Sequence, residues 1–272
     1  MTLAPQPHAG TYAHIEALEH AYVQQHRSYV AWLQAQGQPA TALEIGGGVA
    51  AFTGVASPLS QAVGMGLVPI ADAEAWAGAL RAFFADRGMA ASVELALVTP
   101  PELAATLVAQ GFVPVEYSSV LVMDLQGATL PAATAPQGYL VEPARTPDAT
   151  VLAAALEGFG LPRTPANMDF QHHWYASPGN NQWVARHEGQ PVAVANAYTV
   201  ADTLLLAGAS TLPAHRRRGL QQGLILARLH QALAAGLRWA TVTTDPASVS
   251  EANMLRLGFS RLYARVKWVA AL

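Results

Sequence analysis

Hydrophobic and polar positions follow two different periods along the chain, and together they predict a mixture of helices and strands. Between Tyr12 and Gln36, apolar residues recur every three to four positions, as in an amphipathic helix, whereas shorter apolar runs bounded by Gly or Pro are typical of strands. The predicted helices span residues 12–36, 73–86, 102–110, 149–158, 165–175, 219–235 and a short segment ending at 257. The predicted strands span residues 42–53, 62–70, 93–98, 113–123, 139–142, 182–186, 192–199, 203–211, 239–244 and a last segment ending at 268.

The pattern divides into two similar halves. Residues 126–137 are rich in Ala, Thr and Pro, which is typical of a linker. On each side, a helix, a glycine turn, a strand, a proline-containing turn and a helix precede a Gly-Phe pair, at Gly111 and at Gly258. We therefore predict a tandem repeat, with domains at 1–125 and 138–272. Strands mixed with helices in this order predict an α/β (α+β) fold, in which each domain has a mostly antiparallel mixed sheet flanked by helices.

Composition narrows the function classes. Hydrophobic residues make up 52% of the 272 residues, but no apolar run reaches the roughly 18–20 residues that a bilayer requires. No basic segment followed by an apolar run marks a signal peptide, so we expect a cytoplasmic protein without a membrane partner. Cysteine is absent, which excludes disulfides and thiolate metal sites, and we expect no metal. A net charge of −3 gives no support for a nucleic-acid partner.

The clearest chemical signal is the segment TLPAHRRRGLQQG, residues 211–223, between a predicted strand and a long predicted helix. A glycine loop that enters a helix directs backbone N–H groups outward, where they can bind a pyrophosphate. Gly219 and Gly223 allow the backbone to approach the phosphates closely, and the arginines at 216–218 add positive charge. Arginines at a helix start oppose the helix macrodipole unless an anion binds beside them. The pattern therefore favours a phosphate site over a merely solvated helix start.

The spacing Pro213-x-x-Arg216-x-x-Gly219-x-Gln221 resembles the Gln/Arg-x-x-Gly-x-Gly/Ala signature of the GNAT superfamily of N-acetyltransferases. The resemblance covers the second half of the chain, although Gln221 replaces the final Gly or Ala. It implies acetyl-CoA as co-substrate, central strands that splay apart, pantetheine paired with the strand at Ser210 and Leu212, and a small-molecule or peptide amine as acceptor. The cofactor-binding residues that we expect are Ser210, Thr211, Leu212, Arg216, Arg217, Arg218, Gly219, Leu220, Gln221, Gln222, Gly223 and Asn253.

The same resemblance leaves the acid and the base open. Met254 stands where the family often has a tyrosine that protonates the leaving thiolate, so Tyr263 is the remaining candidate acid, unless it is an ordinary strand tyrosine. His172 and His173 are candidate bases on the predicted acceptor-side helix, and structural roles for both are the alternative. Adjacent helical residues point about 100° apart, so at most one of the two histidines can face the cleft.

The first half has lost the phosphate loop and carries a different glycine motif. Asp72 and Glu74 occupy the matching position and would repel a pyrophosphate, so we expect only the second half to bind CoA. The sequence LEIGGGVA at 43–50 resembles the first motif of S-adenosylmethionine-dependent methyltransferases, but Gly54 and Pro58 interrupt the helix that this motif requires. A non-catalytic acyl-CoA sensor or partner protein remains the alternative function, and the chain is either a monomer or a homodimer.

Overall fold

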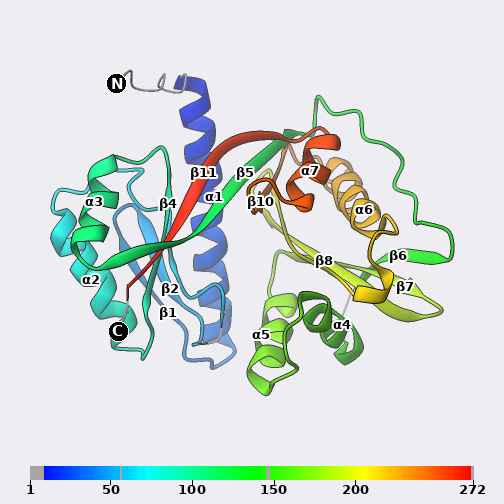
Figure 1. Ribbon diagram of the computed structural model, residues 1–272, viewed down its shortest axis with the longest axis horizontal. Helices are drawn as coiled ribbons and strands as arrows, with labels where there is room; N and C mark the ends of the chain where they lie inside the picture. Colours follow the sequence, from blue (N-terminus) through cyan, green and yellow to red (C-terminus); the bar gives the residue numbers. More distant parts are fainter. Residues whose placement is uncertain (1–8, 56, 145–147, 271–272) are drawn as a thin grey trace.

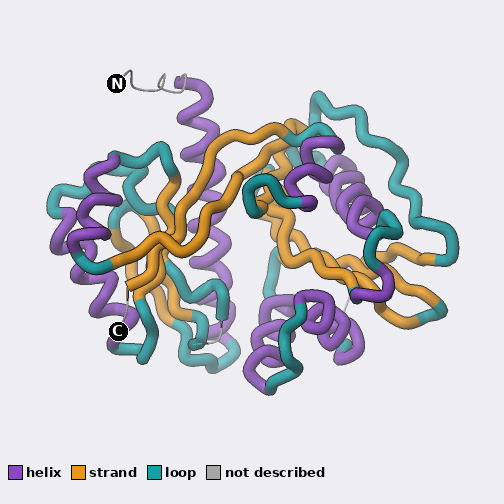
Figure 2. The backbone as a smooth tube through the Cα atoms, in the orientation of Figure 1, coloured by secondary structure: helices purple, strands orange, loops and turns teal. Residues whose placement is uncertain are grey.

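The computed structural model describes residues 9–55, 57–144 and 148–270, which form one mixed sheet flanked by helices (Figures 1 and 2). The helices are α1 Ala9–Ala35, α2 Ala73–Ala85, α3 Pro101–Ala109, α4 Ala149–Phe159, α5 Pro165–Ala176, the 3-10 turn η1 Pro213–His215, α6 Leu220–Ala234 and α7 Val249–Arg256. The strands are β1 Thr41–Ile45, β2 Gly48–Phe52, β3 Ala62–Val63, β4 Ala91–Ala96, β5 Phe112–Asp124, β6 Tyr139–Ala144, β7 Asn180–His187, β8 Gln190–Val200, β9 Thr203–Thr211, β10 Trp239–Thr244 and β11 Ser260–Ala270. The predicted α/β class is confirmed.

The two halves share their longest strands. The strand order is β1-β2-β3-β4-β11-β5-β10-β9-β8-β7-β6, so β11 from the second half lies between β4 and β5 of the first half. In turn β5 separates β11 from β10, and the two long strands cross together from one half to the other (Figure 1). The expectation of two separate sheets is therefore wrong: a single sheet of eleven strands runs through both halves. The boundaries at 125 and 138 stay a prediction.

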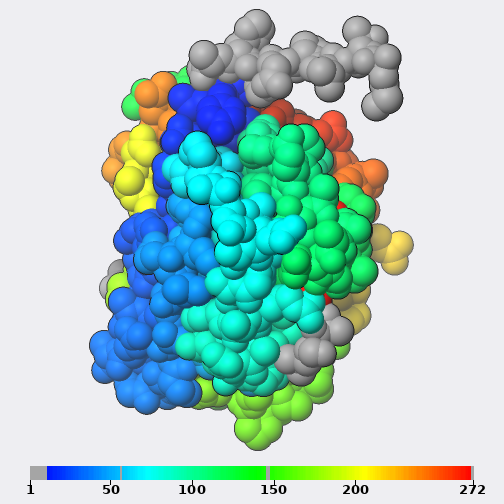
Figure 3. Space-filling view, turned by 90° about the vertical axis from the view of Figure 1, so that its left-hand side faces the viewer, coloured from blue at the N-terminus to red at the C-terminus, as the bar shows by residue number. Residues whose placement is uncertain are grey.

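Helices α2 and α3 cover the strands of the first half, on the face shown in Figure 3. Leu80 and Phe84 of α2 and Leu107 of α3 pack against Val93 in a common apolar core. Asp72 caps α2, because its carboxylate accepts the N–H of Ala75. Asp72, one of the two acidic residues expected to repel a pyrophosphate, therefore also stabilises the start of α2.

The glycines at 46–48 close a hairpin. Gly46 and Gly47 have φ of 61° and 81° in the turn between β1 and β2, a left-handed geometry that suits a two-residue hairpin. A Cβ on Gly48 would lie 2.0 Å from the carbonyl oxygen of Val63, so β3 needs a glycine beside it. A strand follows the motif where a methyltransferase needs a helix, so the methyltransferase hypothesis is wrong. The strand expected at 62–70 is only the short β3.

Helix α1 lies across the middle of the molecule and packs on both halves (Figure 1). Ile15 and Leu18 contact the apolar cluster that contains Val120 of β5, whereas Tyr29 packs edge-on against Trp174 of α5, with ring centroids 5.1 Å apart. The helix therefore holds the first half against the side of the second. Within the described part of the chain, no helix is long and apolar enough to span a bilayer.

His26, buried on α1, gives stability a pH dependence. Burial lowers its pKa to about 4, and its Nδ1 lies 2.9 Å from the carbonyl oxygen of Tyr22. The unfolded chain takes up this proton near pH 6.5 and the folded chain only near pH 4, so stability is lost as the pH falls through that window. We expect His26 to account for about 2 kcal/mol of unfolding free energy lost between pH 7 and pH 5.

Urea unfolding of the wild type and of His26→Phe at both pH values measures this contribution. We expect the variant to lose less stability than the wild type, while His20→Phe, at an exposed position of the same helix, behaves as the wild type. Equal losses in the wild type and His26→Phe would show that the imidazole does not control this window.

Candidate active site

Strands β9 and β10 separate at the centre of the second half. Their parallel pairing runs from Thr203 and Trp239 to Leu206 and Val242, and then stops. Beyond that point β9 continues along β8, and β10 continues along β5. The expected splay of the central strands is therefore confirmed, and it exposes backbone groups on the facing edges of two strands.

A bulge in β9 accounts for the separation. The pairing of β9 with β8 shifts register between Val194 and Asn196, which face Ser210 and Ala207. Three steps on β9 thus oppose two on β8, and such an extra residue bends its strand. Gly208 within the bulge has a φ of 55°, and a Cβ there would lie 2.1 Å from the side-chain amide of Asn196. The glycine therefore permits both the left-handed backbone and the close approach of Asn196.

Two buried side chains fix this bulge from beneath. Arg228 of α6 donates from Nη1 to the carbonyl oxygen of Asn196 at 2.6 Å, and burial lowers its pKa to about 9. The Asn196 amide, oriented to satisfy its neighbours, accepts from Trp174 Nε1 at 2.7 Å and donates to the Ala207 oxygen at 2.9 Å. The backbone carbonyls of Asn196 on β8 and Ala207 on β9 are thereby held near the point where β9 separates from β10.

A groove of about 670 Å³ follows β9 from the bulge to the start of α6. It is lined by most of the residues expected to bind the cofactor, namely Ser210, Thr211, Arg216, Arg217, Gly219, Leu220, Gln221, Gln222 and Asn253. Gly219 is the N-cap of α6 with a φ of 79°, and the first N–H groups of a helix have no partner inside it. The groove therefore ends on the free amides of the first turn of α6.

Three expected cofactor-binding residues, Leu212, Arg218 and Gly223, do not line this groove. The N–H of Leu212 donates to the Val192 oxygen at 2.9 Å, so that group is already taken by β8. The N–H of Gly223 donates to Gly219, and a Cβ on Gly223 would lie 3.5 Å from the Thr134 oxygen. The second glycine of the motif therefore faces the 126–137 segment at ordinary contact distance rather than the groove, which local sequence could not reveal.

Arg216 has a bracing role in addition to its charge. Its guanidinium donates to the carbonyl oxygens of Thr211 at 3.1 Å and Gly158 at 3.0 Å, and so ties the loop to β9 and α4. Gly158 lets the two elements approach, because a Cβ there would lie 2.9 Å from the Thr211 nitrogen. The sequence signal for Gly158 was a glycine inside a helix, which often marks close packing.

Asn253 joins α7 to the loop. Its amide nitrogen donates to the side-chain oxygen of Gln221, and its oxygen accepts from Arg256. Gln221, the residue that departs from the signature, also donates to the Ser250 hydroxyl at 3.2 Å. The long side chain at this position is therefore turned toward α7, and it links the first turn of α6 to the opposite wall of the groove.

A second hollow adjoins the groove at the bulge. This cavity, of about 650 Å³, reaches the bulge at Ala207 and Gly208, while the groove begins at Ala209. Its walls come from α4 and α5 on one side and from α1, Val55 and residues 57–59 on the other. The first half of the chain thus completes a cavity in the second half.

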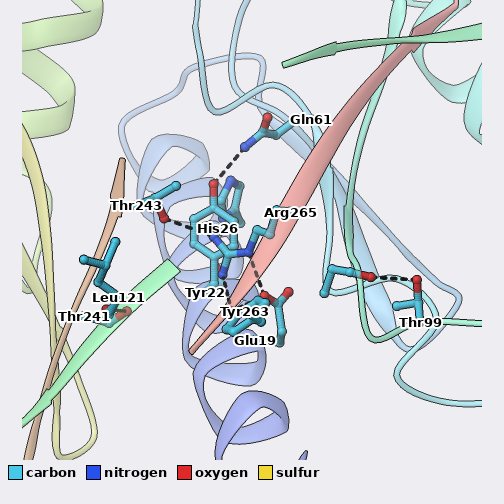
Figure 4. A network of polar contacts seen from close by, with 11 residues as sticks. Glu19, Tyr22, His26, Gln61, Thr99, Leu121, Thr241, Thr243, Tyr263 and Arg265 are labelled. Atoms are coloured by element: carbon cyan, nitrogen blue, oxygen red, sulfur yellow. Dashed lines mark hydrogen bonds and ion pairs between the residues drawn. The ribbon is translucent and has the colours of Figure 1, made fainter. Parts of the chain in front are cut away.

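The structure does not bring Tyr263 to the groove or the cavity. Its hydroxyl donates to Glu19 and accepts from Arg265 at 3.0 Å within a buried network (Figure 4). Burial raises the pKa of this hydroxyl well above its ordinary value, so the phenol holds its proton firmly. Met254 is 3% exposed in the core beneath α7. The geometry gives Tyr263 a structural position and does not favour it as the acid.

The two candidate bases lie away from the splayed strands. His173 contacts Asp169 of its own helix at 3.2 Å and packs edge-on against Trp32, while His172 is exposed. Neither lines the cavity or the groove. Other residues of α5, among them Gln171 and Trp174, line the cavity instead.

Sequence reasoning missed the residues of the cavity. Gln171, Trp174 and Arg265 line it, together with Tyr22 of α1. Arg265 and Tyr22 are far apart in the chain and look like ordinary amphipathic positions, and they meet only because β11 crosses α1. An arginine among apolar residues of a strand was the one available signal for this site.

Comparisons with known proteins agree with this architecture. Residues 149–259 match the family model described as Acetyltransferase (GNAT) family. A GCN5-related N-acetyltransferase from Kribbella flavida superposes with a TM-score of 0.65 at 22% identity, covering 91% of this chain and 96% of that one. A tandem GNAT protein from the clavulanic acid biosynthesis pathway superposes with a TM-score of 0.57 at 19% identity, covering 72% and 68%.

A GCN5-related N-acetyltransferase from Sphaerobacter thermophilus has a TM-score of 0.54 at 15% identity, covering 66% of this chain and 59% of that one. At these identities the likeness to solved structures concerns the fold, and no curated protein matches the sequence. The family assignment therefore depends on the matched segment, which contains the bulged strand, the loop and both helices of the groove. Over residues 149–259, a segment that contains every residue lining the groove, this chain matches the GNAT acetyltransferase family.

Proposed function

We propose that the chain transfers an acetyl group from acetyl-CoA to an amine, with CoA bound by the second half alone. The observation that carries the proposal is the meeting of the groove and the cavity at residues 207–209, where β9 leaves β10. A long ligand in the groove would place its reactive end at the splay, and a second molecule in the cavity would reach the same point.

The residues of the groove suit the parts of CoA. The free N–H groups of Leu220, Gln221 and Gln222 would receive the pyrophosphate at the helix start, and the exposed Arg217 would add charge. The unpaired edge of β9 at Ala209 and Ser210 would receive the pantetheine amides. Acetyl-CoA supplies an activated thioester, and backbone N–H groups near the bulge would stabilise the charge that develops on its carbonyl oxygen.

Calorimetric titration with CoA tests this site, and two neighbouring arginines provide a matched pair. Arg217 lines the groove and Arg218 does not, although both side chains are exposed. We expect Arg217→Glu to weaken CoA binding about tenfold, or about 1.4 kcal/mol, and Arg218→Glu to change it less than about threefold at near-physiological salt, where distant charges are screened. No binding of CoA by the wild type, or equal losses in both variants, would contradict the proposed site.

A non-catalytic acyl-CoA sensor is the second candidate, and the buried Met254 at the position of the family's usual acid favours it. Release of free thiol from acetyl-CoA in the presence of amines separates the two functions. Binding of CoA without thiol release across a broad amine panel would support the sensor and refute the transferase.

A further inference from the structure

The cavity beside the splayed strands is formed largely by aromatic and aliphatic side chains. Phe159, Phe170 and Trp174 line it from α4 and α5, while Leu18 and Tyr22 line it from α1. Its volume of about 650 Å³ is in the range of small-molecule sites. Apolar walls strip water from any bound amine and so disfavour its charged form. Flat aromatic walls also offer stacking and edge contacts to a flat ligand.

One guanidinium adds to this preference for a neutral amine. Among the described residues that line the cavity, Arg265 carries the formal charge, and its side chain is 6% exposed. Its counter-ion Glu19 accepts a hydrogen bond from Arg265 Nε at 2.7 Å and does not line the cavity. The guanidinium of Arg265 also lies 4.2 Å from the ring centroid of Tyr22. The cavity therefore faces the cation more directly than the carboxylate that balances it. A bound ammonium would be repelled from this wall, whereas a neutral amine would not.

Gln171 adds a neutral amide to this wall. The residue is 6% exposed on α5 and lines the cavity, although its Oε1 is itself fully buried. A carboxamide carries no charge, so it cannot neutralise an ammonium. The described residues that line the cavity include no carboxylate, so none of them balances a charged amine.

We propose that the acceptor is a weakly basic amine on a flat aromatic body, an arylamine, whose ring lies between the aromatic walls of this cavity. This inference rests on the proposed acetyl transfer. The amine nitrogen attacks the acetyl carbonyl carbon, so a C–N bond forms and the C–S bond breaks. The proton lost by the nitrogen passes through water to the leaving sulfur, which gives an N-acetylarylamine and free CoA. An arylamine is already neutral near pH 7, so no base is needed before the attack.

Two probes of similar shape test the proposal. At pH 7, 2-naphthylamine is neutral, whereas 2-naphthylmethylamine carries the same rings with a charged ammonium. With acetyl-CoA and the full chain, we expect kcat/KM for 2-naphthylamine to exceed that for 2-naphthylmethylamine at least tenfold. We also expect 2-naphthylamine to bind more tightly than 2-naphthylmethylamine, as measured by fluorescence. Equal or reversed preferences, or acetylation of neither probe, would overturn the proposal.

Substitutions at Gln171 give a second readout. Gln171→Glu places a carboxylate of the same shape in the cavity, and we expect it to shift the kcat/KM ratio at least tenfold toward 2-naphthylmethylamine with CoA affinity unchanged. Gln182→Glu is the control, because Gln182 is equally buried but does not line the cavity. Phe170→Asp, at a partly exposed position of the wall, replaces Gln171→Glu if that variant fails to fold. An unchanged ratio in the folded cavity variants contradicts the assignment.

Titration with CoA distinguishes a failure of the proposed transferase activity from a failure of the arylamine proposal. No binding of CoA refutes the proposed transferase itself. Binding of CoA with efficient acetylation of 2-naphthylmethylamine refutes only the arylamine assignment.

Discussion

Glu19→Leu is expected to lower the free energy of unfolding by about 3–5 kcal/mol, because it leaves a buried arginine without its counter-ion. Glu19 is 3% exposed, and its carboxylate accepts from Arg265 Nε at 2.7 Å and from the hydroxyl of Tyr263. Both partners are on β11, so the substitution weakens the contact of α1 with the strand shared by the two halves. Urea unfolding at pH 7 measures the loss.

Two further variants show whether the lost charge is the cause. Glu16→Leu, at a partly buried position of the same helix, should cost less than about 1 kcal/mol. Glu19→Leu combined with Arg265→Met should recover much of the loss, because a buried ion pair replaced by apolar side chains is often tolerated. A double variant as unstable as Glu19→Leu alone would mean that packing, rather than the unpaired guanidinium, determines the loss.

Gly208→Val is expected to reduce turnover by about 100-fold or more, because a shift of about 1 Å in a catalytic strand can have that effect. A β-branched residue is strained at a φ of 55°, and its Cβ would lie 2.1 Å from the Asn196 amide. The bulge of β9 would have to move, and with it the edge that faces the splay. The groove beyond the bulge is formed by other residues, so CoA affinity should change much less than kcat.

Gly189→Val provides the matched control. Gly189 has a φ of 79° in the turn between β7 and β8, and a Cβ there would meet nothing within 4 Å. The two variants share the backbone strain, and only Gly208→Val adds the clash at the bulge. Thiol release, CoA titration and thermal melting are measured on both. Comparable losses of kcat in the two variants would contradict a specific role of the bulge.

The elements and the phosphate loop could be predicted because their signals are local. Apolar periodicity identified α1 and β9 to within a few residues, and the glycine and arginine pattern placed the loop before α6. The helix begins at Leu220 rather than Gly219, because Gly219 adopts the left-handed conformation of a cap. Splaying of β9 and β10 followed from the family resemblance, and the bulge supplies its physical reason.

The roles of single side chains could not be predicted where they depend on distant neighbours. Gly223 looked like a phosphate contact, but its N–H is bonded within α6 and the residue faces Thr134 rather than the groove. Tyr263 was a candidate acid because it follows the Gly-Phe pair, but Glu19 of α1 binds its hydroxyl in a buried network. Periodicity also marked β5 and β11 without revealing that each pairs with strands of the other half, because alternating apolar residues do not specify a neighbour.

The shared strands also affect how the chain can fold during synthesis. The sheet of the first half is completed by β11, which leaves the ribosome after almost all of the second half. Until then the edge of β4 has no partner, and an unpaired edge can bind other chains. Pairing across so long a separation is slow, so a nascent or truncated first half would depend on chaperones until β11 arrives.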